Sequence, residues 1–547
     1  MKNHTPTPIL ATLLACALAA SCHPAESNLA ANTGYRIIPR PQEMAYTEGS
    51  TVIPEKVSVA FPDEFASEAS MLKDYLAEDN DVSAILKAGK ESGRIILKKD
   101  SALDSIPGQY RIITDGNIEI SAADAKGIFY GIQSLRQMII NDTTASVLAV
   151  RNGEINDWPA FQWRSFLLDD ARNFRGMKNV KIFLDEMARL KMNIFHWHLT
   201  DDPGWRIEIK KYPLLTEVGS KRDSTQLEWR GKEYDPNPHG GFYSQEQIKE
   251  VLAYAKERHI TVMPEIEMPG HSSAAIASYP WLGTVGKQIK VPCYFSAEAV
   301  DMLNVTDPKV IAFLHDVLDE VMDLFPSPVI HIGGDEATFD VWKDSPAIRK
   351  YMKEHNIKTL SDVQLDFTNR MSDYIASKGR RMMGWSDIGR NPHEKVIGVA
   401  DSGGQLKEGT IIQFWMGDIS QIKDAAERGY DIVNSYNMCS YLDYDYNRLP
   451  LENSYNFDPI PADLPEGLHS KIIGCGAQLW TEWIRTDEKM FYQAFPRIAA
   501  IAEAGWTESN NKDYGIFMEN LHGLLEVWDA NGIGYGPAED TSRTSEY

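Results

Sequence analysis

The sequence predicts an α/β protein in which a small α+β domain precedes a (β/α)8 TIM barrel. After Trp158-Pro159 the chain alternates short apolar strands with amphipathic helices, which is the pattern of successive βα units in a parallel sheet. Eight such strands can be identified, and eight parallel strands close a barrel. The length of 547 residues leaves room for a barrel of roughly 250 residues or more and for a second hydrophobic core.

The strands expected in the barrel are short and apolar. They lie at residues 166–168, 194–197, 260–263, 329–332, 381–384, 411–414, 431–434 and 472–475. Amphipathic helices are expected between them. Two of these helices are predicted to begin at capping boxes, formed by Ser244 with Gln247 and by Ser361 with Gln364.

Residues 35–159 mix short strand-like segments with two helical patterns, at residues 65–76 and 127–140. This mixture predicts a small α+β domain. It holds no cluster of polar residues that suggests chemistry, so we interpret it as a packing module. The barrel is assigned to residues 160–510, and residues 511–547 are predicted to form a C-terminal helix and tail.

Residues 1–22 are predicted to be a lipoprotein-type signal peptide, followed by a polar linker at residues 23–34. A weakly basic start leads into the apolar stretch Ile9–Ala20, which is too short to span a bilayer. The small residues before Cys22 resemble the lipobox of bacterial lipoproteins. We therefore expect lipidation at Cys22 and an exported protein of the cell envelope, anchored by lipid to a bacterial membrane and facing the periplasm or the surface. Ordinary secretion with cleavage nearby is the alternative.

The composition excludes several classes of partner. A formal net charge of −23, without any basic run, repels phosphate backbones, so nucleic-acid binding is not expected. Beyond the signal, the cysteines Cys293, Cys439 and Cys475 are too few and too scattered for a disulfide scaffold. No CxxC pair occurs, so we expect no structural zinc, and we expect no other cofactor.

The segment His331–Glu336, His-Ile-Gly-Gly-Asp-Glu, carries the strongest signal for chemistry. In a regular strand Asp335 and Glu336 would point to opposite faces, and the two glycines before them make a break in the strand easy. Glycosidases with an enzyme nucleophile place two carboxylates about 5–5.5 Å apart on either side of the scissile bond, for which chain neighbours are badly placed. If the protein is a glycosidase, the attacking group comes from elsewhere.

Polar and aromatic side chains follow the other expected strands as well. In such a barrel the active site lies at the carboxyl ends of the strands. The residues found there are Asp169, Arg172, His198, Asp201, Glu265, Glu267, His271, Trp385, Trp415, Tyr441, Asp443, Trp480 and Glu482. Flat aromatic faces with carboxylates around them suit a sugar ring, which offers apolar C–H faces and equatorial hydroxyls.

Four motifs in this chain resemble those of the glycoside hydrolase family 20 β-N-acetylhexosaminidases. They are Trp197-His-Leu-Thr-Asp-Asp, Pro264-Glu-Ile-Glu-Met-Pro-Gly-His, His331-Ile-Gly-Gly-Asp-Glu and Trp480-Thr-Glu, and the resemblance extends over residues 35–506. It implies an exo-acting, retaining enzyme that removes terminal GlcNAc or GalNAc from glycans. In such enzymes the carbonyl oxygen of the substrate's own 2-acetamido group attacks the anomeric carbon and gives an oxazolinium intermediate. The resemblance thereby supplies the missing nucleophile.

The resemblance also implies roles for individual residues. Glu336 is the expected general acid/base, and Asp335 the residue that orients the acetamido group. The expected substrate-binding residues are Arg172, Asp443 and Glu482 for ring hydroxyls, Tyr441 for the acetamido oxygen, Trp385, Trp415 and Trp480 as pocket walls, and His198. Asp201 and His271, supported by Glu267 and His198, are expected to tune Glu336 from behind, and an acid works best with its pKa raised towards the operating pH.

Two positions depart from the usual family motifs. Pro203 stands where many members have Gln, and Trp385-Ser-Asp replaces the commoner Trp followed by two acids. Both are expected near the pocket rim, where they bear on leaving-group preference rather than on the chemistry. Trp281 is interpreted as a surface packing residue, with a platform for the aglycone as the alternative.

Two other functions remain as alternatives. His196-Trp-His198 resembles the metal-binding HxH of barrel amidohydrolases, which would make the protein a metal-dependent hydrolase. That fold needs further ligands at the ends of later strands, and none follows the fifth or sixth strand. The second alternative is a non-catalytic, glycan-binding surface lipoprotein. The presence of both Asp335 and Glu336 argues against it, because binding alone does not need a proton donor.

Overall fold

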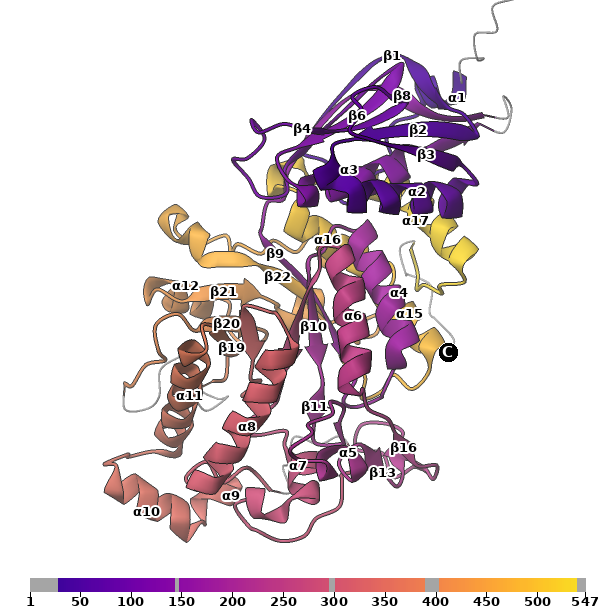
Figure 1. Ribbon diagram of the computed structural model, residues 1–547. Coiled ribbons are helices and arrows are strands. Elements are labelled where there is room, and N and C mark those ends of the chain that lie inside the picture. Colours follow the sequence, from indigo (N-terminus) through magenta and orange to yellow (C-terminus); the bar gives the residue numbers. More distant parts are fainter. Residues whose placement is uncertain (1–27, 143–146, 295–300, 389–402, 539–547) are drawn as a thin grey trace, which may run out of the picture.

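The computed structural model describes residues 28–142, 147–294, 301–388 and 403–538, so the predicted signal peptide and Cys22 lie outside the described residues. A closed parallel barrel carries an α+β domain at one end (Figure 1). The short strand β11 (Thr200–Asp201), which follows barrel strand β10, lies at the opposite end. The carboxyl ends of the barrel strands therefore face away from the N-terminal domain.

All eight predicted barrel strands are present. They are β9 (Trp163–Asp169), β10 (Ile194–His198), β17 (Thr261–Glu265), β18 (Val329–His331), β19 (Arg381–Trp385), β20 (Ile411–Phe414), β21 (Asp431–Asn434) and β22 (Ile472–Leu479). The strands pair in chain order, and β22 closes the barrel by pairing with β9. Buried apolar side chains fill the interior near the strand starts, namely Ile194, Met263, Val329, Met383, Ile411 and Val433. The predicted fold class is confirmed.

Helices cover the outside of the barrel (Figure 1). The longer ones are α4 (Gly176–Arg189), α6 (Gln245–Glu257), α8 (Pro308–Leu324), α10 (Pro346–Glu354), α11 (Leu360–Ser377), α12 (Ser420–Glu427), α15 (Asp487–Ala494) and α16 (Arg497–Trp506). The loops at the carboxyl ends contain the short helices α5 (Leu214–Glu217), α7 (Ser273–Ser278), α9 (Asp340–Lys343), α13 (Asn437–Ser440) and α14 (Leu451–Tyr455). They also contain the two-residue strands β12 (Gly204–Trp205), β13 (Lys221–Arg222), β14 (Thr225–Gln226), β15 (Tyr234–Asp235) and β16 (His239–Gly240).

One of the two predicted capping boxes is correct. Helix α6 begins at Ser244, whose side chain pairs with the backbone of Gln247 while Gln247 reaches back. The prediction for α11 is wrong, because Thr359 caps that helix and Asp362 closes its box. Gln364 takes no part in capping the helix. Its Nε2 instead donates a hydrogen bond to the carbonyl of Gly334 at 2.8 Å. A residue predicted to start a helix instead holds the loop that carries the two acids.

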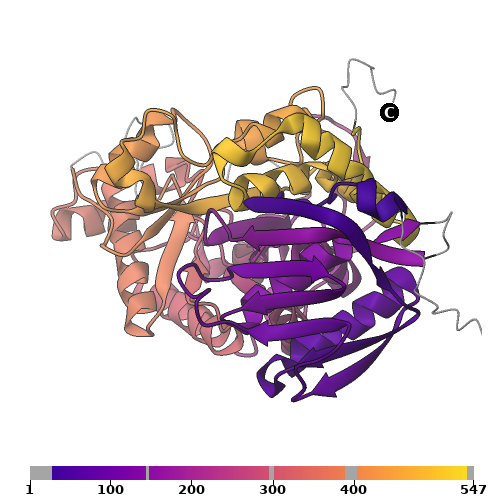
Figure 2. The same cartoon turned by 90° about the horizontal axis from the view of Figure 1, so that it is seen from above.

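The N-terminal domain is a mixed sheet with helices on one face. In sheet order the strands are β1 (Glu43–Ile53), β8 (Val147–Asp157), β5 (Tyr110–Asp115), β6 (Asn117–Ala122), β4 (Ile95–Lys99), β2 (Lys56–Phe61) and β3 (Ser83–Ala88), with β7 (Ile140–Asp142) paired to β8. Helices α2 (Ala66–Asn80) and α3 (Ala125–Met138) lie between this sheet and the barrel, and α1 (Asn28–Asn32) lies beside β1 and β8 (Figures 1 and 2). The predicted α+β character is confirmed.

The C-terminal helix α17 (Tyr514–Asn531) packs beside the barrel near the N-terminal domain, as Figure 1 shows. Its buried Trp528 donates to Glu186 of α4 at 2.8 Å. Within the described segments, Cys293, Cys439 and Cys475 are unpaired. In the same segments, no helix has both the length and the apolar character needed to cross a bilayer.

Candidate active site

The strand that carries the two adjacent acids ends before it reaches them. Strand β18 stops at His331, and the backbone then takes left-handed conformations at Gly333 (φ 64°), Gly334 (φ 92°) and Glu336 (φ 48°). A Cβ atom at Gly333 would overlap the carboxylate of Glu267, so only glycine fits there. The break predicted from the two glycines is therefore present, and it lets neighbouring side chains point to the same side.

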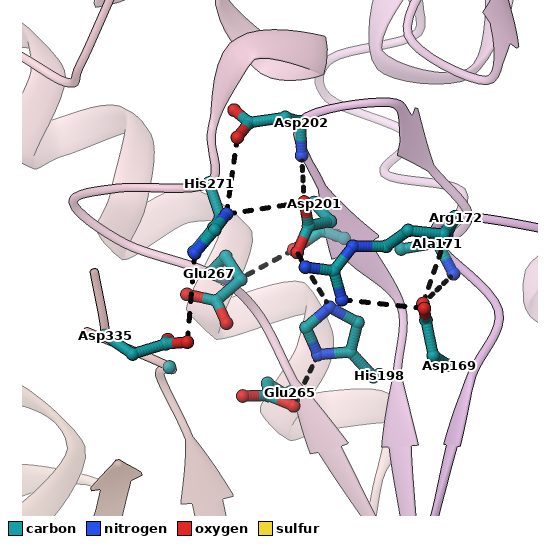
Figure 3. A network of polar contacts seen from close by, with 12 residues as sticks. Asp169, Ala171, Arg172, His198, Asp201, Asp202, Glu265, Glu267, His271 and Asp335 are labelled. Atoms are coloured by element: carbon teal, nitrogen blue, oxygen red, sulfur yellow. Dashed lines mark hydrogen bonds and ion pairs between the residues drawn. The ribbon is translucent and has the colours of Figure 1, made fainter. Parts of the chain in front are cut away.

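Both acids approach the imidazole of His271, and Figure 3 shows the contact made by Asp335. The Nε2 atom of His271 lies 3.8 Å from Asp335 Oδ2 and 3.5 Å from Glu336 Oε2. The other ring nitrogen, Nδ1, lies 3.3 Å from Asp202 Oδ2 and 3.5 Å from Asp201 Oδ1. Although burial opposes it, the negative charge of Asp201 raises the pKa of His271 well above its usual value. The imidazole is therefore a cation that bridges two pairs of carboxylates.

The positive charge of His271 separates the proton affinities of the two acids. Burial raises the pKa of Asp335 to about 7, against the opposing charge of His271. Burial acts on Glu336 in the same direction, but the hydrogen bond and charge of His271 outweigh it and lower the pKa of Glu336 below its usual value. The expectation that His271 contacts Glu336 agrees with the structure. The expected direction of the shift does not, because a cation 3.5 Å away favours the carboxylate.

Asp201 connects this cluster to Arg172. The guanidinium Nη2 of Arg172 lies 2.8 Å from Asp201 Oδ2 and 3.8 Å from Glu482 Oε1. Burial opposes ionisation of Asp201, but the charges of Arg172 and His271 lower its pKa, so that Asp201 remains a carboxylate. Arg172 is consequently held in place at the base of the pocket with part of its guanidinium directed at Glu482.

Beneath this layer, Glu265 at the end of β17 accepts several hydrogen bonds. Its carboxylate lies 2.5 Å from His198 Nδ1 and 2.8 Å from His331 Nδ1, and Trp385 Nε1 donates to it at 2.7 Å. Burial alone would raise the pKa of Glu265, but the surrounding histidines hold it well below its usual value. His198 is fully buried and also contacts Asp201 at 3.1 Å, which agrees with its expected supporting position and not with the substrate contact that was also expected of it.

Glu267 and Trp385 also lie behind the pocket. Burial and the nearby charge of Asp335 raise the pKa of Glu267 well above its usual value, so it is neutral beneath Asp335. Gly334 N donates to Glu267 Oε2 at 3.3 Å, which ties the acid-bearing loop to β17. Trp385 is 1% exposed and packs 5.6 Å from the ring of Trp480, so it backs a pocket wall.

The other expected residues converge on a pocket of about 490 Å³. Those that line it are Asp335, Glu336, Arg172, Trp415, Tyr441, Asp443, Trp480 and Glu482. The ring of Tyr441 stacks 6.0 Å from Trp415, and the Arg172 guanidinium lies 5.0 Å from the Trp480 ring. Burial raises the pKa of both Asp443 and Glu482, so these carboxyls are suited to donate as well as to accept hydrogen bonds.

Two acceptor atoms in this pocket are left without a partner. Asp335 Oδ1 and Asp443 Oδ1 are buried and accept no hydrogen bond from the described residues. Both oxygens are therefore available to accept hydrogen bonds from the N–H or O–H groups of a polar, uncharged ligand.

Several residues of the site were missed by the sequence reasoning. Trp229, Tyr294 and Trp483 line the mouth of the site, and Tyr444 and Arg448 line its far wall. Trp483 and Tyr444 each stand close in the chain to a residue that was identified, and this proximity was an available signal. Trp229 lies in the loop that joins the antiparallel strands β14 and β15, and nothing in its sequence context relates it to the barrel ends.

Trp281 is a surface packing residue, as the sequence favoured. It contacts Phe313 of α8 edge-on at 5.9 Å, and the Lys309 ammonium lies 3.8 Å from its ring. It lines neither pocket of the site. Pro203, by contrast, does line the rim.

Among the described residues, three groups of side chains bring possible metal ligands together, namely His196–Glu265–His331, His198–Glu265–Glu267 and Asp201–Asp202–His271. In the first two groups Glu265 already bonds to imidazole nitrogens, and burial lowers the pKa of His196 to about 4, which keeps it neutral. In the third, the carboxylates neutralise the His271 cation. Other atoms of these groups, namely His196 Nδ1, His331 Nε2 and Glu267 Oε1, are buried and have no hydrogen-bond partner among the described residues.

Comparison with known proteins agrees with this geometry. The sequence matches the glycosyl hydrolase family 20 catalytic domain over residues 161–509 and domain 2 of that family over residues 34–158. A beta-hexosaminidase of Porphyromonas gingivalis is 35% identical over 523 residues, covering 92% of this chain. This chain spans 64% of the length of that relative.

Solved structures give the same relationship. The GH20 exo beta-N-acetylglucosaminidase of Vibrio harveyi, determined in complex with N-acetylglucosamine, aligns with a TM-score of 0.80 at 31% identity, over 92% of this chain and 78% of that one. The beta-N-acetylhexosaminidase of Bacteroides fragilis aligns with a TM-score of 0.78 at 31% identity, over 93% and 99% of the two chains.

The closed barrel and its pocket of carboxylates and aromatic rings define a (β/α)8 protein of the carbohydrate-active class. Since the family matches extend over both domains, the assignment can be made more specific. The chain belongs to glycosyl hydrolase family 20.

Proposed function

We propose that this protein is an exo-acting, retaining β-N-acetylhexosaminidase that removes terminal GlcNAc or GalNAc from glycans. The observation that carries the proposal is the orientation of Asp335 and Glu336, which both approach one nitrogen of His271 at the edge of the same pocket. Two carboxylates on one side cannot bracket a glycosidic bond. One of them can protonate the leaving oxygen while the other holds the substrate's acetamido group.

The reaction then proceeds through the substrate itself. Glu336 gives its proton to the glycosidic oxygen as the bond to C1 breaks, and the acetamido carbonyl oxygen bonds to C1 from the opposite face. Asp335 accepts the amide N–H and stabilises the positive charge of the resulting oxazolinium ring. Water, deprotonated by Glu336, opens that ring at C1 and restores the original configuration. Burial of Asp335 strengthens these charge interactions.

The names of similar proteins support this proposal. The relative from Porphyromonas gingivalis is named a beta-hexosaminidase, and the Vibrio harveyi structure holds N-acetylglucosamine. The buried, partnerless acceptors Asp335 Oδ1 and Asp443 Oδ1 suit an amide N–H and a sugar hydroxyl. Whether GlcNAc or GalNAc is preferred depends on the contacts of the 4-hydroxyl.

The test uses paired chromogenic β-glycosides. We expect turnover of the GlcNAc and GalNAc glycosides and very poor turnover of the matching glucoside, which has a 2-hydroxyl and therefore no internal nucleophile. A thiazoline that mimics the cyclised intermediate should inhibit strongly, since such analogues bind roughly 10²–10⁸ times tighter than substrates. Equal rates on the glucoside, or a 2-fluoro glycoside trapped on a carboxylate, would show that an enzyme nucleophile operates.

We further propose that the protein is exported and anchored to a bacterial membrane through lipid on Cys22. The small-residue run before that cysteine supports this proposal. A Cys22→Ala variant is expected in the soluble fraction of cells in which the parent protein fractionates with membranes. A variant that stays with the membranes would contradict lipidation at this position.

A further inference from the structure

A second pocket of about 300 Å³ opens beside the first one. The two share Arg172, Glu336, Glu482, Trp229 and Trp483 as lining residues. The pocket that holds Tyr441 and Asp443 provides the walls and polar groups for one sugar ring, so the second pocket is additional space that adjoins it at Glu336.

The position of Glu336 indicates which part of a substrate the second pocket would bind. The carboxyl that protonates the leaving oxygen must face the bond that breaks, so the departing group lies next to it. Glu336 is 38% exposed in its side chain, whereas Asp335 is 15% exposed, so Glu336 is the more open of the two acids. The space shared by Glu336, Pro203 and Tyr294 is therefore on the path of the leaving group.

Two large aromatic side chains are exposed at this position. Trp229 is 65% exposed and Trp483 is 36% exposed, although both line the site. The Arg230 guanidinium lies 4.3 Å from the Trp229 ring and restricts its position. Exposed indole faces at the rim of a polar pocket are typical of carbohydrate contacts, because the C–H face of a pyranose covers them.

The charge of the second pocket restricts the class of ligand that it can bind. Asp201, Asp202, Glu336 and Glu482 line it against the cations Arg172 and His271. An aglycone that carried sulfate or another anionic group would be repelled by the excess of carboxylates. A neutral sugar would meet hydrogen-bonding groups as well as the indole rings.

We propose that Trp229 and Trp483 form a binding platform for a neutral second sugar ring, the one on the leaving side of the scissile bond. The proposal rests on the hexosaminidase function proposed above. It makes Trp229, in the loop between β14 and β15, a specificity-determining residue for oligosaccharides over glycosides whose aglycone has no ring.

The test compares the kcat/KM of each variant on two substrates. The first is the β-1,4-linked GlcNAc disaccharide, and the second is a small alkyl β-glycoside of GlcNAc, which cannot reach the platform. We expect Trp229→Ala and Trp483→Ala each to lower kcat/KM for the disaccharide by roughly three- to ten-fold, mainly through KM. The alkyl glycoside should lose clearly less than the disaccharide, although both indoles also line the first pocket, and Trp229→Phe should recover most of the disaccharide activity.

Tyr234→Ala is the matched control. Tyr234 lies in β15 after the same loop and is 42% exposed, but it lines neither pocket, so its removal should leave both substrates unchanged. Equal losses of kcat/KM on the two substrates, or no loss on the disaccharide, would contradict the proposal that Trp229 and Trp483 bind the second sugar ring. Failure to cleave any GlcNAc glycoside would instead contradict the proposed function, so the two failures are distinguishable.

A binding measurement gives a second readout. In the Glu336→Gln background, the affinity for the disaccharide should fall on Trp229→Ala while the affinity for free GlcNAc stays constant, as followed by tryptophan fluorescence or calorimetry. Parallel losses of both affinities would place Trp229 at the first ring and contradict the proposal.

Discussion

At the scale of single residues, the acids of the site function as a pair with one proton. His271 lowers the pKa of Glu336, and burial raises that of Asp335 to about 7. The proton of the free enzyme therefore resides mainly on Asp335. In the proposed reaction, a substrate whose amide N–H is donated to Asp335 would favour the ionised form of that carboxyl and shift the proton to Glu336, the proposed acid.

The first prediction follows for the pH dependence of kcat/KM. Above about pH 7 the pair loses its single proton and no acid remains, so activity should fall as pH rises through that value. On the acid side the fall begins only below the usual range of a glutamic acid, where Glu336 also gains a proton. The measurement is kcat/KM against pH for the disaccharide, whose departure needs protonation.

Asp335→Asn supplies the control for this assignment. The only remaining proton is then on Glu336 beside the His271 cation, so the alkaline limb of the residual activity should move to lower pH. If the activity of this variant still falls near pH 7, a group other than Asp335 determines the alkaline limb of the pH profile.

The second prediction concerns Glu336→Gln. General acid catalysis contributes about 10²–10⁴-fold, so the variant should lose about that much on substrates with poor leaving groups and much less on activated aryl glycosides. Steady-state rates on the disaccharide and a dinitrophenyl glycoside of GlcNAc measure the difference. Equal losses on the two would contradict the role of Glu336 as the acid.

Motif reasoning could predict residues that line the pocket, but not their protonation states. Asp335, Glu336, Arg172 and Glu482 stand at strand ends in recognisable motifs, and they line the pocket. The direction of the Glu336 shift depends on a distance of 3.5 Å to a residue 65 positions earlier in the chain, which no local pattern contains.

At the scale of elements, the shape of one strand end decides where the acids lie. Strand β18 has only three residues, and the loop after it is fixed by the left-handed glycines, by Glu267 and by the Gln364 bond from α11.

The barrel strands could be predicted from the sequence, because apolar runs bounded by turns were enough to identify all eight. The long strands β1 and β8 were not predicted, because charged and polar residues interrupt their alternation and their pairing with each other supplies the stability.

The third prediction is for Gly333→Ala. An alanine at φ 64° costs about 1–2 kcal/mol of stability, and its Cβ would also displace the Glu267 carboxylate and the loop above it. Because a displacement of about 1 Å can cost about 10²-fold in rate, kcat should fall by about that factor. The melting temperature and kcat are measured together.

Gly379→Ala is the matched control for the backbone effect. Gly379 has φ 74° between α11 and β19, and a Cβ there meets open space. This variant should show a similar loss of stability with unchanged kcat. If both variants lose kcat equally, backbone strain alone explains the result and the contact with Glu267 is irrelevant.

At the scale of the whole molecule, Asp157 joins the two domains at the end of the barrel away from the site. It ends β8, is fully buried, and accepts hydrogen bonds from Lys191 Nζ at 3.0 Å, Trp506 Nε1 at 3.0 Å and Gln42 N at 3.0 Å. These residues belong to the N-terminal segment, to the turn after α4 and to α16. Their meeting could not be predicted from the sequence, since each is an ordinary residue in its local context and they lie far apart in the chain.

The fourth prediction is that Asp157→Ala strongly destabilises the protein without changing its chemistry. Burial lowers the pKa of Lys191, and the charge of Asp157 is what keeps its ammonium group paired. Removing one partner of a buried ion pair costs about 3–5 kcal/mol, because the other charge is left without compensation. Urea unfolding should therefore show a lower midpoint, while kcat/KM at 25 °C stays within about two-fold because the site lies at the opposite barrel end.

The sign of the pH effect and a double variant make this prediction specific. Without Asp157 the folded-state pKa of Lys191 falls further below its unfolded value, so the unfolded chain binds more protons and stability should rise with increasing pH. Replacing both partners, as Asp157→Ala with Lys191→Met, removes the buried charge and should recover part of the lost stability. If the double variant is less stable than Asp157→Ala alone, the unpaired ammonium is not the cause, and the hydrogen bonds to Trp506 and Gln42 must account for the cohesion of the two domains.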